Sequence, residues 1–305
     1  MKSQLVSFQS ADGLNLSGLL YEPKKRSKKV AIFLHGNGNA SVFNNPGLQN
    51  LIGETLAKKG IAYFPFDNRG AHYIKSLKKK VGGKLKRFTL GSGFELIRDC
   101  VKDIDGAVAF LKRQGFKEFY LMGASTGAVK IPVYNFYKPK NIFSGFIFLG
   151  ASDDTGIYYT EWGPKKFFSI LKMAKTKIEK GEGEELVPKH FAGTNIISWK
   201  SLFDTINPDG DYNIFPFNEY WNDLHLAKKK KLFRELQSIK TSSLFIYGAK
   251  DEFCYGKVPQ IVETLKEKIL HKKIFDFRII QNSDHGYHGK EKELAKLLAD
   301  WLGTH

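Results

Sequence analysis

Residues Phe119–Val129 read FYLMGASTGAV, and this stretch decides how the rest of the chain is interpreted. Its first four residues form a short apolar run that is typical of a buried strand. The run ends at Gly123, and the residues from Thr126 onward are compatible with a helix, so Ser125 is expected at the turn between the two. Residues 123–127 match the pattern G-x-S-x-G in the strand–turn–helix context that this pattern requires.

A strained turn of this kind would project the Ser125 hydroxyl away from the sheet, toward a substrate. The residues two before and two after the serine have to be small, because a larger side chain would meet the neighbouring strand and helix. The N-terminus of the following helix supplies free N–H groups and a positive dipole end, which suit a developing oxyanion. Ser125 is therefore the candidate nucleophile, with an ordinary buried turn serine as the alternative.

Length and composition fit a globular protein. The chain has 305 residues, 42% of them hydrophobic, which is enough for one large core or for one core with a substantial insertion. No apolar run approaches the length of a membrane-spanning helix, and the start, MKSQLVSFQS, lacks the apolar segment of a signal peptide. Two cysteines, Cys100 and Cys254, are too few for a disulfide framework or a cysteine metal site. We therefore predict a cytoplasmic protein without a membrane span.

The formal net charge is +17, and much of it lies in short lysine-rich runs. A basic excess of this size invites a nucleic-acid interpretation. However, each run falls in an expected loop or at the edge of an element, and no helix-turn-helix, zinc-finger or ribonucleoprotein sequence accompanies them. We expect solvated surface lysines rather than a nucleic-acid-binding protein, with attraction of an anionic substrate or surface as an alternative. The runs are 24–29, 75–80, 84–87 and 228–231.

Strand and helix patterns alternate through most of the chain before the serine. An antiparallel edge pair, a central strand, a helix and a further strand are predicted, in that order, at 5–8 with 14–21, 30–34, 46–59 and 61–66. Residues 71–93, rich in lysine and glycine, are expected to form an irregular surface excursion. A long helix is predicted from about Phe94 to Gln114, where Gly115 ends it.

Beyond the serine, the alternation is interrupted. A strand is expected at 146–149, but residues 155–238 hold helical stretches, polar loops and many large aromatic side chains. Strands and helices alternate again afterwards, at 244–247, 258–270, 274–280 and 290–302. We therefore interpret 155–238 as a cap inserted into a core formed by residues 1–154 and 239–305. The predicted fold class is α/β, with a doubly wound, mostly parallel sheet.

A serine nucleophile needs an adjacent base, which a third group orients. Asp251 follows the strand at 244–247, and His285 follows the last strand. Catalytic groups of open α/β sheets gather at the carboxyl ends of the strands, so both residues are expected beside Ser125. The chain order serine, aspartate, histidine is that of the α/β-hydrolases.

The sequence resembles the α/β-hydrolase-fold serine hydrolases over nearly its whole length except the cap. The resemblance is carried by HGNGN at 35–39, DNRG at 67–70, GASTGA at 123–128, GAKD at 248–251 and SDHG at 283–286. It implies Ser125 as nucleophile, His285 as general base and Asp251 as the acid that holds the histidine. It also implies an oxyanion hole formed by the backbone N–H groups of Asn37 and Thr126.

The turn around the serine departs from the commoner family pattern at Ala124, where histidine is usual. Its Ser-Thr-Gly sequence, with Lys130 just beyond, is similar to the fungal siderophore-esterase branch of the family.

Alternatives stay open for the base and the acid. His288 is a rival base, and Asp153 or Asp154 could supply the acid in place of Asp251. Asp284 is expected to cap its loop. The aromatic side chains of the cap either pack it onto the sheet or line an apolar pocket above the serine.

Three further residues are interpreted as structural rather than catalytic. His35 is expected to make a hydrogen bond within its loop, and Arg69 is expected to form a bridge rather than a substrate clamp. Nothing marks Cys254 as a nucleophile.

The function predicted from these residues is that of a serine carboxylesterase that works through an acyl-enzyme and needs no metal or organic cofactor. The expected substrate is a small-molecule ester with a bulky or aromatic group. A thioesterase, amidase or acyltransferase with the same triad, or a non-catalytic ligand-binding protein on the same fold, is the alternative. A homodimer is compatible with the sequence.

Overall fold

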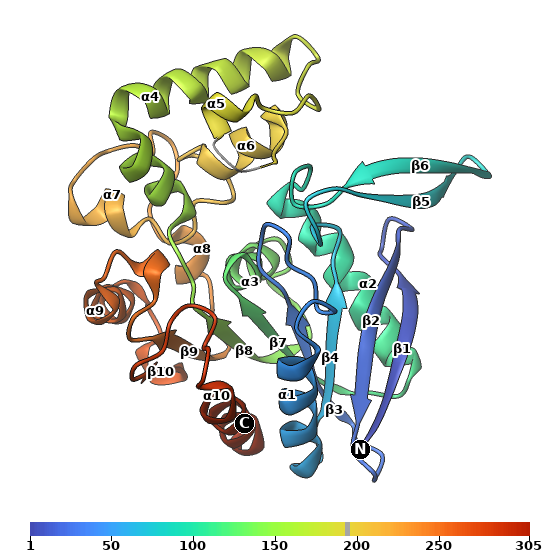
Figure 1. The fold of residues 1–305 in the computed structure, drawn as a ribbon. Helices are drawn as coiled ribbons and strands as arrows, with labels where there is room; N and C mark the ends of the chain where they lie inside the picture. Colours follow the sequence, from blue (N-terminus) through green and yellow to red (C-terminus); the bar gives the residue numbers. More distant parts are fainter. Residues whose placement is uncertain (193–195) are drawn as a thin grey trace.

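A mixed sheet of eight strands forms the centre of the computed structural model, which describes residues 1–192 and 196–305 (Figure 1). Its strand order is β1-β2-β4-β3-β7-β8-β9-β10. The first two strands pair antiparallel, β2 is antiparallel to β4, and all other neighbours are parallel. The bounds are β1 Lys2–Gln9, β2 Asn15–Glu22, β3 Lys29–Leu34, β4 Ala62–Asp67, β7 Glu118–Ala124, β8 Phe143–Leu149, β9 Ser242–Gly248 and β10 Phe275–Ile280. The predicted α/β fold with a mostly parallel sheet is confirmed.

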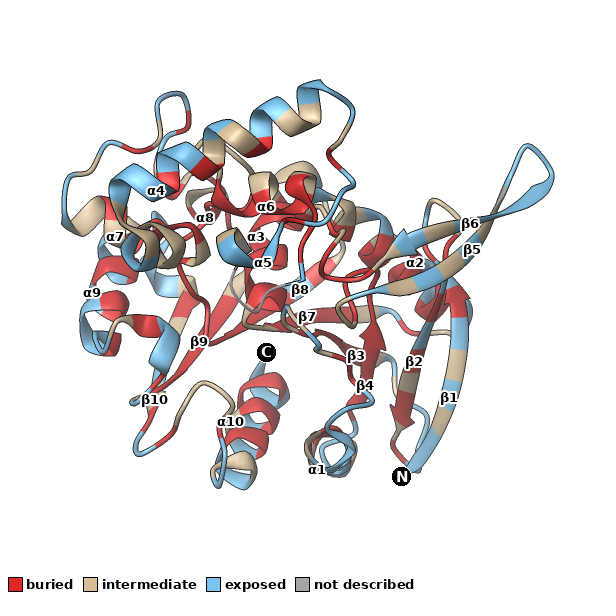
Figure 2. Ribbon diagram, turned by 45° about the horizontal axis from the view of Figure 1, so that its top comes forward, coloured by how far each residue is buried: buried red, intermediate tan, exposed pale blue. Residues whose placement is uncertain are grey.

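Helices cover both faces of this sheet, which is why its inner strands are continuous apolar runs. One apolar cluster joins α1 and α10 to one face, and a larger cluster joins α2, α3 and α9 to the other. In Figure 2 the central strands are coloured as buried along most of their length. The bounds are α1 Pro46–Lys58, α2 Cys100–Arg113, α3 Thr126–Tyr137, α9 Val258–Lys268 and α10 Glu291–Thr304.

Residues 71–93 do not form the irregular excursion that the sequence predicts. They contain a two-stranded antiparallel hairpin, β5 (Lys75–Val81) and β6 (Lys84–Leu90), which forms a sheet of its own. Gly82 and Gly83 make its turn with φ of 57° and 79°, as a two-residue hairpin loop requires. These residues include few apolar side chains, without the regular alternation that would indicate strands.

The helix predicted from Phe94 to Gln114 is also shorter than expected. A single 3₁₀ turn, η1 (Ile97–Asp99), precedes α2, so the α-helix begins only at Cys100. The Ile97 N–H donates to the Asp204 carboxylate at 2.7 Å, an acceptor that lies far along the chain. Gly115 ends the helix, as predicted, with φ of 95°.

The described residues between the neighbouring strands β8 and β9 form five helices: α4 Asp154–Glu179, α5 Lys189–Ala192, α6 Trp199–Ile206, α7 Phe217–Trp221 and α8 Arg234–Gln237. An apolar cluster of their own, which includes Phe167, Trp199 and Leu202, joins α4 to α6. The aromatic side chains of Phe215 and Phe217 belong instead to the main core. Within the described part of the chain, no helix is both long and apolar enough to cross a bilayer.

Candidate active site

Ser125 lies at the turn between β7 and α3, with φ of 55° and ψ of −125°. This backbone conformation is strained for a residue with a side chain, and such strain is typical of functional turns. The Ser125 N–H donates to the Leu149 carbonyl at 2.8 Å, which fixes the turn to the neighbouring strand. A Cβ on Gly123 would collide with the Gly127 carbonyl, and a Cβ on Gly127 would collide with the Leu34 carbonyl. The predicted need for small residues on both sides of the serine is confirmed.

A cavity of about 640 Å³ opens beside this turn. Ser125, Thr126, Asn37 and His285 all line it, although they come from three separate segments of the sequence. Within residues 1–192 and 196–305, the Ser125 hydroxyl makes no hydrogen bond. It is therefore free to meet a ligand in the cavity.

His285 lies in the loop after β10 and contacts Asp251, which lies in the loop after β9. Its Nδ1 lies 2.9 and 3.0 Å from the two carboxylate oxygens of Asp251. The Asp251 side chain is fully buried and that of His285 is 15% exposed. Burial by itself would lower the pKa of His285, but the hydrogen bond and the charge of Asp251 raise it above the ordinary 6.5. With the Nδ1 proton held by the carboxylate, Nε2 is left as the acceptor nitrogen.

Two backbone features bring this pair close to the sheet. Gly150, after β8, has φ of 57°, and a Cβ there would lie 3.0 Å from the His285 ring. The Asp251 Oδ1 accepts the Phe253 N–H at 3.0 Å, which orients the carboxylate. A glycine after β8 is thus required for the histidine loop to pack where it does.

The loop after β3 packs directly on the serine. A Cβ on Gly36 would lie 3.0 Å from the Ser125 Cβ, which is tighter than an ordinary van der Waals contact, so glycine favours this close approach. His35 holds the loop: its Nε2 accepts the Asn68 N–H at 3.2 Å, and its Nδ1 donates to the Gly36 carbonyl at 2.8 Å. Burial lowers the pKa of His35 well below 6.5, with the charge of Lys130 adding to the effect, so the ring is neutral. His35 makes the loop hydrogen bond that the sequence predicts.

The two residues expected to form the oxyanion hole flank the serine from different sides. Asn37 is exposed, and its side-chain oxygen accepts the Gly38 N–H at 2.8 Å. Thr126 is buried, and its hydroxyl oxygen accepts a hydrogen bond from the Tyr212 hydroxyl at 3.2 Å. Tyr212 was not singled out by the sequence analysis, because nothing in its local sequence indicates a contact with α3.

The two alternative acids make other contacts than Asp251 does. Asp153 accepts the N–H groups of Gly156 and Asn218, each at 2.8 Å, so it caps α4 and holds the segment before α7. Asp154 lines the cavity and accepts the Ser152 hydroxyl at 3.3 Å, while its buried Oδ2 has no partner among the described residues. Burial raises the pKa of Asp153 to about 7 and that of Asp154 to about 6.

His288 and Asp284 pair with each other away from the cavity. The His288 Nδ1 lies 2.7 Å from Asp284 Oδ2, and the His288 side chain is 75% exposed. Asp284 also accepts the His288 N–H at 2.9 Å, which is the loop-capping role predicted for it. Cys254 is buried, and burial raises the pKa of its thiol, so it has the properties of an inert core cysteine.

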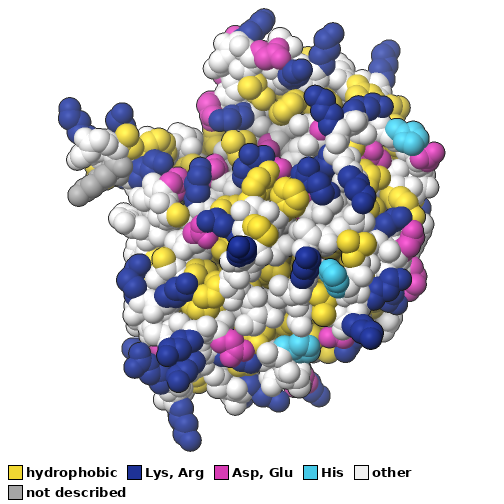
Figure 3. Space-filling model, turned by 180° about the vertical axis from the view of Figure 1, so that it is seen from behind, with side chains coloured by type: hydrophobic (Ala, Val, Ile, Leu, Met, Phe, Trp, Pro, Cys, Tyr) yellow, Lys and Arg dark blue, Asp and Glu magenta, His cyan; other side chains and the backbone are white. Residues whose placement is uncertain are grey.

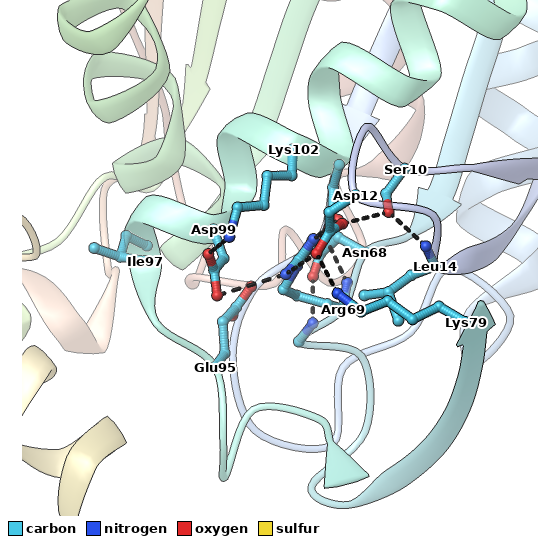
Figure 4. Close-up of polar contacts among 12 residues, drawn as sticks. Ser10, Asp12, Leu14, Asn68, Arg69, Lys79, Glu95, Ile97, Asp99 and Lys102 are labelled. Carbon is cyan, nitrogen blue, oxygen red and sulfur yellow. Dashed lines mark hydrogen bonds and ion pairs between the residues drawn. The ribbon is translucent and has the colours of Figure 1, made fainter. Parts of the chain in front are cut away.

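Arg69 is the centre of a charged cluster beneath the loop after β4 (Figure 4). Its guanidinium donates to Asp103 at 2.7 and 3.0 Å and to Asp12 at 2.9 Å. Burial by itself would lower the pKa of Arg69, but Asp103 and Asp12 raise it overall, so the residue stays charged. Arg69 is thus a structural bridge, as predicted.

A second buried ion pair lies next to it, and the sequence analysis did not predict it. Lys130, on α3, is fully buried and donates to Glu95 at 2.7 and 2.9 Å and to the Asn68 side-chain oxygen at 3.2 Å. Because the Asn68 N–H binds His35, this pair connects the helix behind Ser125 to the loop that packs on the serine. A buried charge left without its partner is costly, so the pair fixes the relative position of these segments.

The cavity lining includes apolar, aromatic and acidic side chains. Its aromatic members are Tyr73, Tyr158 and Phe253. Asp154 and Glu161 are the carboxylic acids, and the described lining contains neither lysine nor arginine. No group of three or more His, Cys, Asp or Glu side chains in residues 1–192 and 196–305 has an arrangement that could hold a metal ion.

Comparison with known proteins places this geometry in context. Residues 88–302 match the family described as "Protein of unknown function (DUF1749)". A comparison with curated proteins found no match.

Solved structures with a similar fold cover almost the whole chain. The α/β hydrolase GrgF from Penicillium sp. sh18 aligns with a TM-score of 0.63 and 16% identity over 100% of this chain and 99% of that one. Est1E from Butyrivibrio proteoclasticus, with ferulic acid bound, aligns with a TM-score of 0.62 and 14% identity over 97% and 98%. The esterase domain of a Rhodothermus marinus protein aligns with a TM-score of 0.57 and 16% identity over 100% and 99%. At these identities the likeness shows the fold, which is that of the α/β hydrolases.

Proposed function

The chain belongs to the DUF1749 family and has the α/β-hydrolase fold, and from its site we propose that it is a serine carboxylesterase. The observation that carries the proposal is the contact of the buried Asp251 carboxylate with Nδ1 of His285, whose side chain lines the same cavity as Ser125 on its strained strand–helix turn. A nucleophile, a base and a group that orients the base are the parts that nucleophilic catalysis needs.

In the proposed reaction, the Ser125 hydroxyl attacks the ester carbonyl carbon while His285 Nε2 takes its proton. The oxygen of the tetrahedral intermediate is stabilised by the N–H groups of Thr126 and Asn37, aided by the positive end of the α3 dipole. His285 then protonates the leaving alcohol, and the acyl group stays on Ser125. Water, deprotonated by His285, releases the acid and restores the serine. Asp251 stabilises the imidazolium at both stages.

We also propose that residues 155–238 act as a cap over this cavity. Ile157, Tyr158 and Glu161 on α4 contribute to the lining, so the segment between β8 and β9 helps to select the substrate. The aromatic lining favours an ester with an aryl or bulky apolar group. Est1E binds ferulic acid, which is an aromatic acid, and this supports the choice of an aryl ester.

The acidic lining leads to the first prediction, that neutral esters are better substrates than anionic ones. Asp154 and Glu161 repel a carboxylate at short range, so the kcat/KM of a hemisuccinate ester of 4-nitrophenol should be about tenfold lower than that of the neutral butyrate. Release of 4-nitrophenol, followed spectrophotometrically, measures both substrates. The substrate series also includes the benzoate ester, and the matched butyryl thioester and amide are added to compare ester hydrolysis with other acyl chemistries.

The Glu161→Gln variant is the control, because this exposed side chain makes no contact with the proposed triad. It should improve hydrolysis of the hemisuccinate and leave the butyrate unchanged. Failure of a folded protein to hydrolyse any of these esters would contradict the carboxylesterase proposal. Preference for the thioester or the amide would replace it with another acyl chemistry at the same serine.

The second prediction concerns pH. His285 must be neutral to accept the serine proton, and its pKa in the folded protein is raised by Asp251. Activity should therefore rise with pH, with a midpoint above the ordinary histidine pKa of 6.5. The kcat/KM of the butyrate ester measured from pH 5 to 9 tests this, with circular dichroism at each pH as the control for unfolding. A midpoint below 6.5 would argue against His285 as the base held by Asp251.

A further inference from the structure

The hairpin β5–β6, residues Lys75–Leu90, projects away from the body of the protein (Figures 1 and 3). Seven of its sixteen residues are lysine or arginine, and none is acidic. In Figure 2 its outer end is coloured as exposed. The fold and the proposed reaction leave this concentration of positive charge without a role.

The base of the hairpin is anchored to the body. The Lys75 ammonium donates to the Asn68 carbonyl at 2.6 Å, and that of Lys79 pairs with Asp12 at 3.2 Å. Leu77 and Leu90 pack against the main core. These contacts anchor the hairpin to the body and use the ammonium groups of Lys75 and Lys79.

Four other cations between residues 78 and 87 have no such use. Lys78, Lys84, Lys86 and Arg87 are exposed, and none of them forms an ion pair with another described residue. The run at 228–231 differs, because the Asp209 carboxylate accepts the N–H groups of three successive lysines there. The outer hairpin thus presents uncompensated positive charge to the surroundings.

Apolar side chains accompany this charge at the tip. Val81 is 38% exposed and Leu85 is 59% exposed, and they flank the Gly82-Gly83 turn. In the hairpin register Val81 lies opposite Lys84, while Leu85 lies opposite residue 80, so one apolar side chain is on each face. Exposed apolar side chains next to exposed cations are the combination that binds a bilayer interface.

The composition disfavours a nucleic acid as the occupant. Single strands are bound by aromatic side chains that stack on the bases. The one aromatic residue of the hairpin, Phe88, lies toward its base with the Lys79 ammonium over its ring at 5.0 Å. The exposed valine and leucine side chains would not be buried against a phosphate backbone, whereas their burial in lipid would be favourable in free energy.

We propose that the outer part of this hairpin docks the protein on the surface of an anionic lipid bilayer. Lys78, Lys84, Lys86 and Arg87 contact the lipid headgroups, and the tip residues Val81 and Leu85 enter the interface. The lipid is recognised by its negative charge. The proposal is independent of catalysis, because none of these residues lines the cavity.

The test is sedimentation of the full chain with vesicles of phosphatidylcholine alone or with 30% phosphatidylserine. We expect binding to the anionic vesicles only, weakened strongly by 0.5 M salt. The variant Lys84→Gln/Lys86→Gln/Arg87→Gln should lower the affinity by about 100-fold. The matched control, Lys24→Gln/Lys25→Gln/Lys28→Gln, removes the same charge from an exposed loop and should change the affinity only slightly.

A second pair of measurements separates lipid from nucleic acid. Val81→Ser/Leu85→Ser keeps the charge and should weaken vesicle binding, because the apolar contribution is lost. Circular dichroism and thermal unfolding confirm that each variant is folded. The proposal is overturned if the wild type does not sediment with anionic vesicles at low salt, or if the control loses as much affinity as the hairpin variant. Tight RNA or DNA binding that needs the hairpin cations but not Val81 and Leu85 would also overturn it.

Discussion

Replacement of Ser125 by alanine is expected to lower kcat for the butyrate ester by at least about 10⁴-fold, while the fold is retained. The hydroxyl is the atom that would form the bond to the acyl group, and no other side chain occupies its position on the turn. Alanine fits the same space, because it differs from serine only by the oxygen that faces the cavity. The residual rate would come from binding and from the N–H groups near the oxyanion.

Covalent labelling measures the same residue independently of any substrate. A fluorophosphonate probe reacts with an activated serine, so the wild type should be labelled and the peptide that carries Ser125 should gain the mass of the adduct. Ser152→Ala is the matched control, since Ser152 also lines the cavity but donates its hydrogen bond to Asp154. Equal labelling or equal turnover in Ser125→Ala would exclude Ser125 as the nucleophile.

Asp251→Asn should have the second largest effect, a loss of about 10³- to 10⁴-fold in kcat. An amide cannot stabilise the imidazolium that forms when His285 takes the serine proton, and its NH₂ group can hold the ring in the wrong tautomer. Because the charge of Asp251 raises the pKa of His285, the acid limb of the residual activity should also move to lower pH. The pH profile of kcat/KM measures this shift.

Asp154→Asn is the matched comparison, because the Asp154 carboxylate also lies near His285 without contacting its Nδ1. It removes one charge from the same cavity, so we expect less than a tenfold change in the kcat of the butyrate ester and a smaller movement of the acid limb. A larger loss in Asp154→Asn than in Asp251→Asn would make Asp154 the acid. Thermal unfolding of both variants checks that neither result reflects loss of the fold.

The sequence predicted the parts of the fold that depend on local pattern. The central strands are apolar runs because both of their faces are covered by helices. Helix α1 ends at Lys58 and helix α2 ends at Arg113, close to Gly60 and Gly115, the glycines predicted to end them. The turn around Ser125 could be predicted because its G-x-S-x-G pattern follows an apolar run and precedes a helical segment, although only Gly123 is required by contacts within that unit and Gly127 is required by the neighbouring strand β3.

Two local predictions were wrong, each because the decisive factor lies outside the segment. The hairpin at 75–90 has few apolar residues, and its strands are defined by their pairing with each other and by anchors on Asp12 and Asn68. The residues before Cys100 have a helical pattern, but they meet Asp204 instead of continuing the helix. A local pattern cannot report either partner.

By itself, the sequence determined the α/β fold and the set of residues from which a catalytic site could be built, because alternating burial and small residues at a tight turn leave a local signature. It left open which carboxylate reaches His285. Only the tertiary structure shows that Asp251 does, that Lys130 pairs with Glu95 beneath the site, and that the basic hairpin stands clear of the body. These three features depend on distances between residues far apart in the chain, which are set when helices and strands pack, and no local pattern encodes them.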